Sequence, residues 1–408
     1  MSVENEVGLV EVLINNAGIS RDAMTATTGV ATAKIISRKV LAVPPESAER
    51  RRDVAQEGGL GKRNRSTQRG AGSDGRYVQR YVAHRPTAAT IVRFEREIHR
   101  PIGGITMDEM LDSLVIGGGP AGLTAAIYLG RFRRRVLLVD QGWSRAAWIT
   151  RSHNLPGFPE GVVGSVLLDR MRGQARLYGA TLQTGVIDSL QRSADGAFTA
   201  QVDAVLVSAR TVILATGVLE NKPPLGHVAD AVKRGVMRTC PICDGYESID
   251  RNIAVLGNGE HAAAEALFLR TYTNKLTLLL ADAANGLSQD TQTALGEAGI
   301  KVSHVAIGSV RLEDDDVTAL CTEDGRVHRF DVVYSAFGTT SQTQLAKALQ
   351  ARLDDAGRLF VDAHQQTSIN GLFAAGDLVR GLNQISVANG EAAIAATAIH
   401  NRLPKRFA

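Results

Sequence analysis

Two of the three cysteines of the chain, Cys240 and Cys243, are separated by only two residues. A C-x-x-C spacing closes a small disulfide loop and is common at a helix N-terminus, which stabilises a thiolate. The same spacing occurs in zinc sites, but these need four ligands. Because the chain has no second C-x-x-C and Cys321 stands alone, we interpret the pair as redox-active and expect no metal. Cys321 is expected to be a small buried hydrophobic residue.

Residues 114–129 predict an apolar strand, a glycine-rich turn and a helix, an arrangement that binds the pyrophosphate of a dinucleotide. Gly117 permits the tight turn, Gly119 lets the backbone approach the pyrophosphate, and Gly122 lets the helix pack on the strand. The helix N-terminus then presents free N–H groups to the phosphates. The next strand ends 18 residues after Gly122 in an acid that can bond a ribose hydroxyl. The expected contacts of this turn are Gly117, Gly119, Pro120, Ala121, Gly122 and Asp140.

Two later apolar segments end in turns of small residues and suggest that this dinucleotide is FAD. One spans residues 211–217 and the other residues 372–377, which end in Gly-Asp. An acid at such a turn can accept a hydrogen bond from a flavin ribityl hydroxyl. Either segment alone is more often an ordinary strand end, so the FAD interpretation depends on the set. The residues expected at the flavin from these segments are Ala215, Thr216, Gly217, Gly376 and Asp377.

A second strand, glycine turn and helix starts at residue 252, with Ala262 in place of the third glycine. The strand that follows, residues 276–281, leads to Asp282. Two such units indicate two dinucleotides, one held and one exchanged; the alternative is a Rossmann-like domain that binds no nicotinamide. The expected contacts here are Gly257, Gly259, Ala262 and Asp282.

The net charge of +4 is unevenly distributed along the 408 residues. Residues 1–107 hold 17 Lys and Arg against 11 Asp and Glu, a net charge of +6, so the remainder carries −2. The basic segment has few aromatic side chains that could stack on bases, and we do not expect nucleic-acid binding. Residues 50–100 keep neither helical nor strand periodicity, and we expect residues 26–100 to be largely disordered.

The chain contains no apolar run long enough to span a bilayer, and no signal-peptide core near Met1. Three cysteines cannot form a disulfide scaffold. We therefore expect a cytoplasmic protein with no membrane partner.

Residues 11–24 resemble the Asn-Asn-Ala-Gly segment of short-chain dehydrogenases. The glycine-rich first turn of that family is absent, and a strand without its sheet has nothing to pair with. We interpret this fragment as a fusion scar or an extended reading frame.

Residues 108–406 as a set resemble the low-molecular-weight thioredoxin reductases. The likeness depends on the first glycine turn and on four segments in order, residues 154–161, 215–217, 240–245 and 367–377. It implies an α/β fold with two Rossmann-like (three-layer) nucleotide-binding domains, the second inserted into the first. The implied domains are an N-terminal extension (1–107), a discontinuous FAD-binding domain (108–221 and 341–408) and an NAD(P)-type domain with the C-x-x-C (222–340).

The same resemblance implies an FAD-dependent thiol-disulfide oxidoreductase, usually a homodimer, that passes electrons from NAD(P)H to thioredoxin or another disulfide. Cys243 would meet the flavin, Cys240 would exchange electrons with the substrate, and Asp244 would be the acid–base group. The flavin would also contact Asn154, Gln384 and Ile385, the last two just before a helix that starts near Ser386.

One departure from the family concerns the electron donor. Thioredoxin reductases usually carry a His-Arg-Arg cluster after the second nucleotide strand, which pairs with the 2′-phosphate of NADPH. Residues 280–285 contain no cation, and Asp282 could instead bond the free 2′-hydroxyl of NADH. NADH and NADPH both remain open. The alternative function is that of a dithiol oxidase, or of a relative that takes electrons from donors other than nicotinamides.

Overall fold

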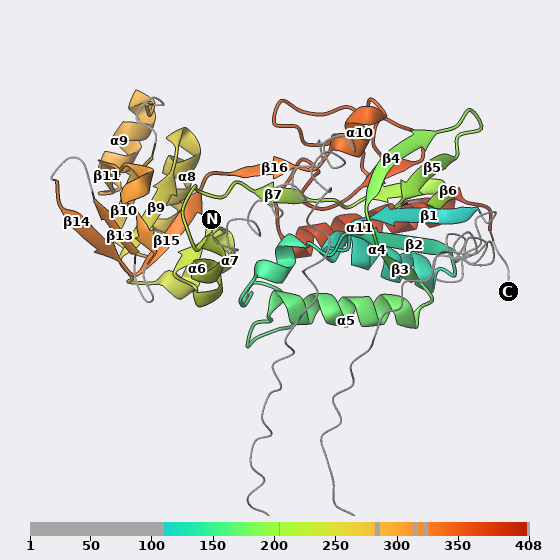
Figure 1. Ribbon diagram of the computed structural model, residues 1–408, viewed down its shortest axis with the longest axis horizontal. Coiled ribbons are helices and arrows are strands. Elements are labelled where there is room, and N and C mark those ends of the chain that lie inside the picture. Colours follow the sequence, from blue (N-terminus) through green and yellow to red (C-terminus); the bar gives the residue numbers. More distant parts are fainter. Residues whose placement is uncertain (1–109, 204, 282–285, 313–316, 321–324, 406–408) are drawn as a thin grey trace, which may run out of the picture. The chain divides into compact units, whose positions relative to one another are not determined.

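The structure is a computed structural model that describes residues 110–405, except 204, 282–285, 313–316 and 321–324. The predicted N-terminal extension, the dehydrogenase-like fragment 11–24, Asp282 and Cys321 all lie outside the described residues. Within them, strands and helices alternate and build two main sheets, as the sequence predicts (Figure 1). No helix of the described part is long and apolar enough to cross a membrane.

The first sheet has seven strands in the order β3-β2-β1-β6-β5-β4, with β17 also paired to β6. The strands β3, β2, β1, β6 and β17 run parallel, whereas β5 is antiparallel to both β4 and β6. The sheet is thus mixed rather than wholly parallel, because Asp195-Gly196 forms a tight turn that joins β4 to β5 as a hairpin. Its strands are β1 (Leu111–Ile116), β2 (Val136–Asp140), β3 (Thr181–Thr184), β4 (Ile187–Arg192), β5 (Phe198–Val202), β6 (Val205–Leu214) and β17 (Leu372–Ala374).

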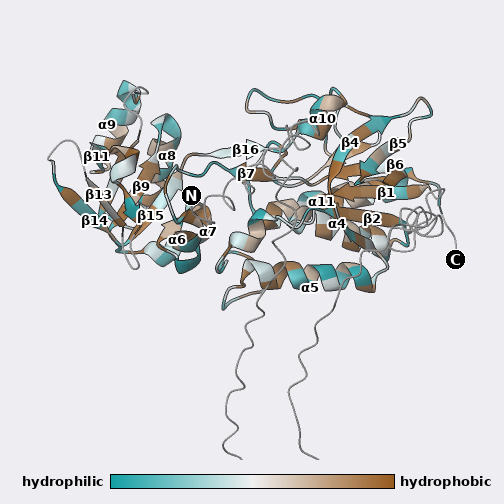
Figure 2. Ribbon diagram, in the orientation of Figure 1, coloured by the Kyte–Doolittle hydropathy of each residue, from teal (hydrophilic) through white to brown (hydrophobic). Residues whose placement is uncertain are grey.

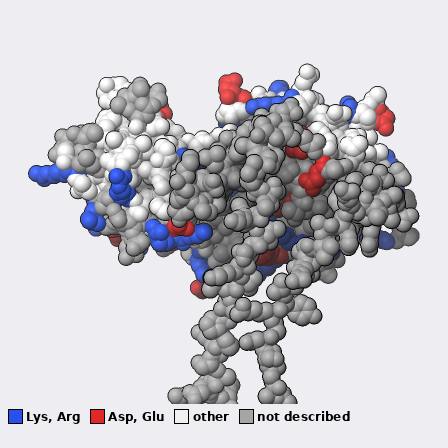
Figure 3. Space-filling model, viewed as in Figure 1, with Lys and Arg blue, Asp and Glu red and all other residues white. Residues whose placement is uncertain are grey.

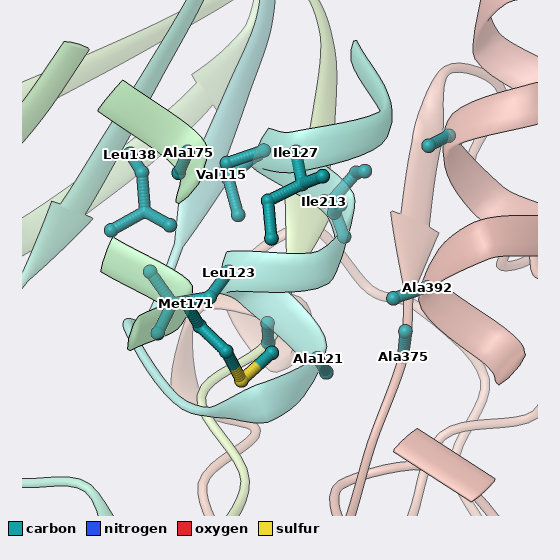
Figure 4. Packing of buried hydrophobic residues seen from close by; sticks show 14 of the residues in the cluster. Val115, Ala121, Leu123, Ile127, Leu138, Met171, Ala175, Ile213, Ala375 and Ala392 are labelled. Atoms are coloured by element: carbon teal, nitrogen blue, oxygen red, sulfur yellow. The ribbon is translucent and has the colours of Figure 1, made fainter. Parts of the chain in front are cut away.

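Helices α4 (Pro120–Arg131), α5 (Gly164–Leu177) and α11 (Ile385–Arg402) contribute to the core on one face of this sheet. Apolar side chains from the strands meet side chains of these helices there, and small alanines of α11 let it pack closely on α4. Alternate strand residues point to a second core on the opposite face, to which α10 (Gln344–Ala348) contributes. Figure 4 labels residues of the first core, among them Val115, Leu123, Ile127, Leu138, Met171, Ala175, Ile213 and Ala392.

The second sheet is parallel throughout, in the order β11-β10-β9-β15-β8. Its strands are β8 (Met237–Arg238), β9 (Ile253–Gly257), β10 (Leu276–Leu280), β11 (Lys301–His304) and β15 (Val332–Ala336). Helices α8 (Gly259–Leu269) and α9 (Gln289–Glu297) contribute to the core on one face. The other face packs on α6 (Val228–Arg234) and on a three-stranded antiparallel sheet of β12 (Arg311–Leu312), β13 (Val317–Leu320) and β14 (Val327–Phe330). The central strands of both sheets are strongly apolar (Figure 2).

Two short strands carry the chain into and out of the second sheet. Strand β7 (Val218–Glu220) pairs antiparallel with β16 (Thr339–Ser341), and Asn221 donates its backbone N–H to the carbonyl of Gly338 at 3.0 Å. The predicted limits of the inserted domain, residues 222 and 340, fall at this ladder and stay a prediction.

Charge on the described surface is mixed. On the face shown in Figure 3, basic and acidic side chains are interspersed. This agrees with the near-neutral balance of the chain after residue 107.

Candidate active site

The two cysteines of the C-x-x-C form a disulfide. Cys240 precedes the single-turn helix α7 (Pro241–Asp244), with Pro241 at a position where its missing N–H costs nothing. The backbone N–H groups of Cys243 and Asp244 both donate to the carbonyl of Cys240, at 3.0 and 3.3 Å. The disulfide is therefore held at the start of a helical turn. The described residues contain no group of three or more His, Cys, Asp or Glu that could hold a metal ion.

A buried tyrosine lies against the acid that follows the second cysteine. The hydroxyl of Tyr334, in β15, donates to Oδ1 of Asp244 at 2.9 Å and lies 3.0 Å from Oγ of Ser248. Arg238, in β8, donates to the Asp244 carbonyl at 2.7 Å and to Ser248 Oγ at 2.9 Å. Asp244 is thus fixed by two strands of the parallel sheet. Sequence analysis assigned no role to Tyr334, which reads as one more core residue of its strand, or to Arg238, which stands two positions before Cys240.

This environment changes the acidity of both groups. Burial raises the pKa of Asp244 to about 6, while the Arg238 charge and the Tyr334 hydrogen bond oppose part of that rise. Burial and the neighbouring Asp244 charge also raise the pKa of the Tyr334 phenol. A carboxyl that titrates near neutral pH can both give and take a proton, which suits an acid–base group.

A glutamine from the far end of the sequence reaches the disulfide. The side-chain Nε2 of Gln384 lies 3.5 Å from Sγ of Cys243 and 3.6 Å from Sγ of Cys240. The other end of the same amide, Oε1, accepts a hydrogen bond of 2.8 Å from Nδ2 of Asn154. Asn154 also donates to the carbonyl of Ile242, between the two cysteines, at 3.3 Å. Three predicted site regions therefore meet at the disulfide.

The loop that carries Asn154 is closed by its own backbone. Ser152 and Val162 exchange two N–H···O bonds of 2.9 Å, and Ser152 Oγ donates to Oδ1 of Asn154 at 2.9 Å. The adjacent His153 places Nδ1 2.9 Å from Oε1 of Glu247, which follows the redox turn. The loop thus contacts the redox turn at Ile242, between the cysteines, and at Glu247, which follows them.

The predicted FAD contacts gather at one edge of the first sheet. Strand β1 pairs with β6, and β6 with β17, so the turns that follow these parallel strands lie side by side. The N–H of Ala215 donates to the Ile116 carbonyl at 2.8 Å, and the N–H of Ala375 donates to the Leu214 carbonyl at 3.0 Å. A parallel sheet binds its ligand at this carboxyl edge. Helix α11 begins at Ile385, one residue earlier than predicted, with Gln384 as its N-cap.

The first glycine turn fits a dinucleotide. Gly117 has a φ of +112°, and a Cβ there would collide with the carbonyl of Ala215. A Cβ at Gly122 would likewise collide with the carbonyl of Gly117, so the helix packs on the turn only because both are glycine. A Cβ at Gly119 would meet only Ser144 Oγ, at 3.4 Å, which leaves the backbone there open to a phosphate. Asp140 ends β2, close to Gly118.

An arginine that the sequence did not single out joins two buried acids. Arg145 begins the short 3-10 helix Arg145–Trp148 and forms ion pairs with Glu220 at 2.5 Å and with Asp377 at 3.1 Å. Burial raises the pKa values of both carboxyls, and the Arg145 charge opposes part of each rise. Arg145 thereby links the Gly-Asp turn of the predicted FAD site to β7. The nearby Glu391 accepts the N–H of Gly376 at 2.7 Å.

The second glycine turn lies at the carboxyl edge of the second sheet. A Cβ at Gly257 would collide with the carbonyl of Ala336, and Ala262 is fully buried beneath the turn. Gly259 has a φ of +55° and open space around its Cβ position, so this turn also leaves its backbone accessible. Glu260 accepts the N–H of Ser288, at 2.7 Å, and thus connects the first turn of α8 to the start of α9.

Comparison with known proteins assigns the chain to a family. Residues 111–392 match the model of the pyridine nucleotide-disulphide oxidoreductase family. The chain belongs to this family. A thioredoxin reductase from Mycolicibacterium smegmatis is 32% identical over 291 residues, which cover 67% of this chain and 90% of that protein. A thioredoxin reductase from Streptomyces coelicolor is 30% identical over 298 residues, which cover 67% of this chain and 87% of that protein.

Two solved structures share the fold. Thioredoxin reductase from Streptococcus pyogenes superposes with a TM-score of 0.66 at 26% identity, covering 72% of this chain and 97% of that one. The structure of HlmI superposes with a TM-score of 0.65 at 28% identity, covering 72% of this chain and 92% of that one. The chain is an oxidoreductase of the thioredoxin reductase-like kind, and the family implies FAD and a nicotinamide cofactor, which both glycine turns fit.

Proposed function

We propose that the protein passes electrons from a nicotinamide through FAD and the Cys240–Cys243 disulfide to thioredoxin or another disulfide. The observation that carries this proposal is the contact of the disulfide with Gln384, at the start of the helix that follows the Gly-Asp turn of the FAD site. The relatives named thioredoxin reductases support thioredoxin as the substrate.

The first sheet supplies the residues that would hold FAD. Gly117, Gly119 and the N-terminus of α4 would bind the pyrophosphate, Asp140 a ribose, and Asp377 the ribityl chain. Bound FAD supplies the transfer of two electrons between the nicotinamide and the disulfide. The second turn, Gly257 and Gly259, would bind the nicotinamide dinucleotide.

The cysteines then act by thiol–disulfide exchange. The Cys240 thiolate attacks the substrate disulfide, a mixed disulfide forms, and one substrate sulfur leaves as a thiolate. The Cys243 thiolate attacks Cys240, which restores the Cys240–Cys243 bond and releases the second substrate sulfur. The leaving sulfurs take up protons, one of them from Asp244, whose pKa near 6 makes it an effective donor.

We further propose NADH rather than NADPH as the donor, because residues 280–285 carry no cation for a 2′-phosphate. We also propose a homodimer in the cytoplasm, from the resemblance and from the scarcity of cysteines.

The experiment compares flavin reduction under anaerobic conditions by NADH, by NADPH and by a dithiol, followed by reduction of thioredoxin. We expect bleaching by NADH and subsequent thioredoxin turnover. Bleaching by the dithiol alone, with no response to either nicotinamide and with oxygen consumption once air is admitted, would instead identify a dithiol oxidase. If neither nicotinamide bleaches the flavin, the proposed direction of electron flow is wrong.

A further inference from the structure

The orientation of the Gln384 side chain follows from a single fixed acceptor. The backbone carbonyl of Ile242 can only accept a hydrogen bond, so Asn154 must present its NH₂ group, Nδ2, to it. The Asn154 Oδ1 accordingly accepts from Ser152 Oγ. The same Nδ2 lies 2.8 Å from the near end of the Gln384 amide, so that end is the oxygen. The NH₂ group of Gln384 is therefore the end nearer the sulfurs, at 3.5 Å from Cys243 Sγ, whereas Oε1 lies 3.9 Å from the same atom.

The contact gains strength when the disulfide opens. Two electrons break the S–S bond and leave two sulfur anions, of which one takes a proton and the other stays a thiolate. An N–H group bonds an anion roughly twice as strongly as it bonds a neutral acceptor. Nε2 of Gln384 lies 3.5 Å from Cys243, and both residues are only partly exposed, so water competes incompletely for this sulfur.

We propose that the Gln384 amide, oriented by Asn154, donates a hydrogen bond to the thiolate that forms on Cys243. Gln384 is then a catalytic residue that stabilises the reduced sulfur, and Asn154 is a positioning residue that acts through it. This inference rests on the redox role proposed above for Cys243. It gives Gln384 a function on the sulfur side of the site, in addition to the flavin contact that the sequence predicts.

The test measures the acidity of one thiol in the full-length flavoprotein. In a Cys240→Ser background, the rate at which iodoacetamide alkylates Cys243 is followed against pH, with the modified peptide identified by mass spectrometry. Gln384→Met keeps the side-chain length and removes the donor. We expect the thiol pKa of Cys243 to rise by about one unit, so that alkylation below both pKa values slows about tenfold. Equal values in the variant and its parent overturn the inference.

Matched variants separate the hydrogen bond from general disturbance. Gln183→Met removes an amide in β3 that donates to the Thr184 carbonyl, and it should leave the thiol pKa of Cys243 unchanged. Gln384→Asn moves the donor away from the sulfur by one methylene and should raise the thiol pKa of Cys243 by a smaller amount. This variant tests the inference if Gln384→Met loses its flavin. An unchanged pKa in Gln384→Asn would then contradict the proposal.

A double-mutant cycle tests the role of Asn154. Asn154→Leu should raise the Cys243 pKa by less than Gln384→Met does, and should add nothing in the Gln384→Met background. Additive effects would show that Asn154 does not act through Gln384. None of these measurements uses an electron donor or a protein substrate, so a failure of the proposed turnover and a failure of this inference give different results.

Discussion

The hydroxyl of Tyr334 lies 2.9 Å from Oδ1 of Asp244, beneath the helical turn that carries the disulfide. The two residues are 90 positions apart in the sequence, and the parallel pairing of β8, β15 and β9 brings them together. The acid–base group proposed for the reaction is therefore tuned from inside the core of the second sheet.

Tyr334→Phe should shift the pH dependence of turnover. The hydroxyl bonds the charged carboxylate, so its loss raises the pKa of Asp244 further above its value of about 6. If the protonated acid is the active form, activity falls as the pH rises through this pKa. The variant should keep its activity to a pH about one unit higher. Tyr246→Phe, at an exposed tyrosine, is the control, and the same profile in both variants would refute the coupling.

Asp244→Asn should change how stability depends on pH. The native carboxyl has a pKa of about 6 and the unfolded one a value of 3.8, so between these values the native state holds the extra proton. Stability conferred at low pH is therefore lost as the pH rises through this window. The amide has no such dependence, so the variant should gain up to about 3 kcal/mol relative to its parent above pH 6. Urea midpoints on both sides of the window measure this.

The matched control for this change is Asp355→Asn, at an exposed aspartate. The stability of this variant relative to its parent should be the same on both sides of the pH window. Turnover gives a second measurement, since loss of a general acid lowers rates by about 10²–10⁴-fold. An Asp244→Asn variant with the turnover of its parent would remove Asp244 from the mechanism.

Cys243→Ser should abolish disulfide turnover and leave FAD bound. The serine hydroxyl cannot form the disulfide, whereas the glycine turns that would hold FAD belong to other strands. Flavin absorbance of the purified variant and thioredoxin reduction measure the two properties separately. Cys321→Ser, which keeps the Cys240–Cys243 pair, is the control. Full activity in Cys243→Ser would show that the redox assignment is wrong.

Arg145→Met should destabilise the first sheet and weaken flavin retention. The change leaves Glu220 and Asp377 as a pair of largely buried carboxylates without their cation. Breaking a buried ion pair in this way costs about 3–5 kcal/mol. The unfolding temperature and the flavin content after gel filtration are the measurements. Arg151→Met, at an exposed arginine that bonds a backbone carbonyl, should change neither.

A partial rescue would confirm the cause of that loss. In the Arg145→Met background, Glu220→Gln removes one of the two unpaired charges and should restore part of the stability. If Glu220→Gln destabilises both backgrounds equally, the ion pair is not the source of the effect.

The sequence predicts those parts of the site that are formed by residues close together in the chain. Glycine turns after apolar strands and the C-x-x-C are read from neighbouring residues, and the structure places the two turns of small residues beside the first glycine turn, as expected for adjacent parallel strands. Arg145, Arg238 and Tyr334 could not be found in this way. Arg145 and Tyr334 have partners far along the chain, and Tyr334 reads only as one more core residue of a strand. Arg238 bonds the Asp244 carbonyl only six positions away, but a contact to a backbone carbonyl leaves no mark in the residue types.

The sequence contains a local indication that the first sheet is mixed, although overall composition does not reveal it. Asp195-Gly196 is a hairpin turn between two alternating segments, and it sets β5 antiparallel to its neighbours. Asn154 and Gln384 were predicted at the flavin, but their contact with each other depends on side-chain directions that no spacing encodes.

The β7–β16 ladder gives the chain modular architecture. Asn221 and Gly338 are joined by a 3.0 Å backbone hydrogen bond, although 116 residues lie between them. The chain therefore leaves the β7–β16 ladder and returns to it at the same place, so the two ends of the intervening stretch lie side by side. A short loop in its place would close the ladder without moving the flanking strands, so the first sheet pairs its own strands independently of this stretch.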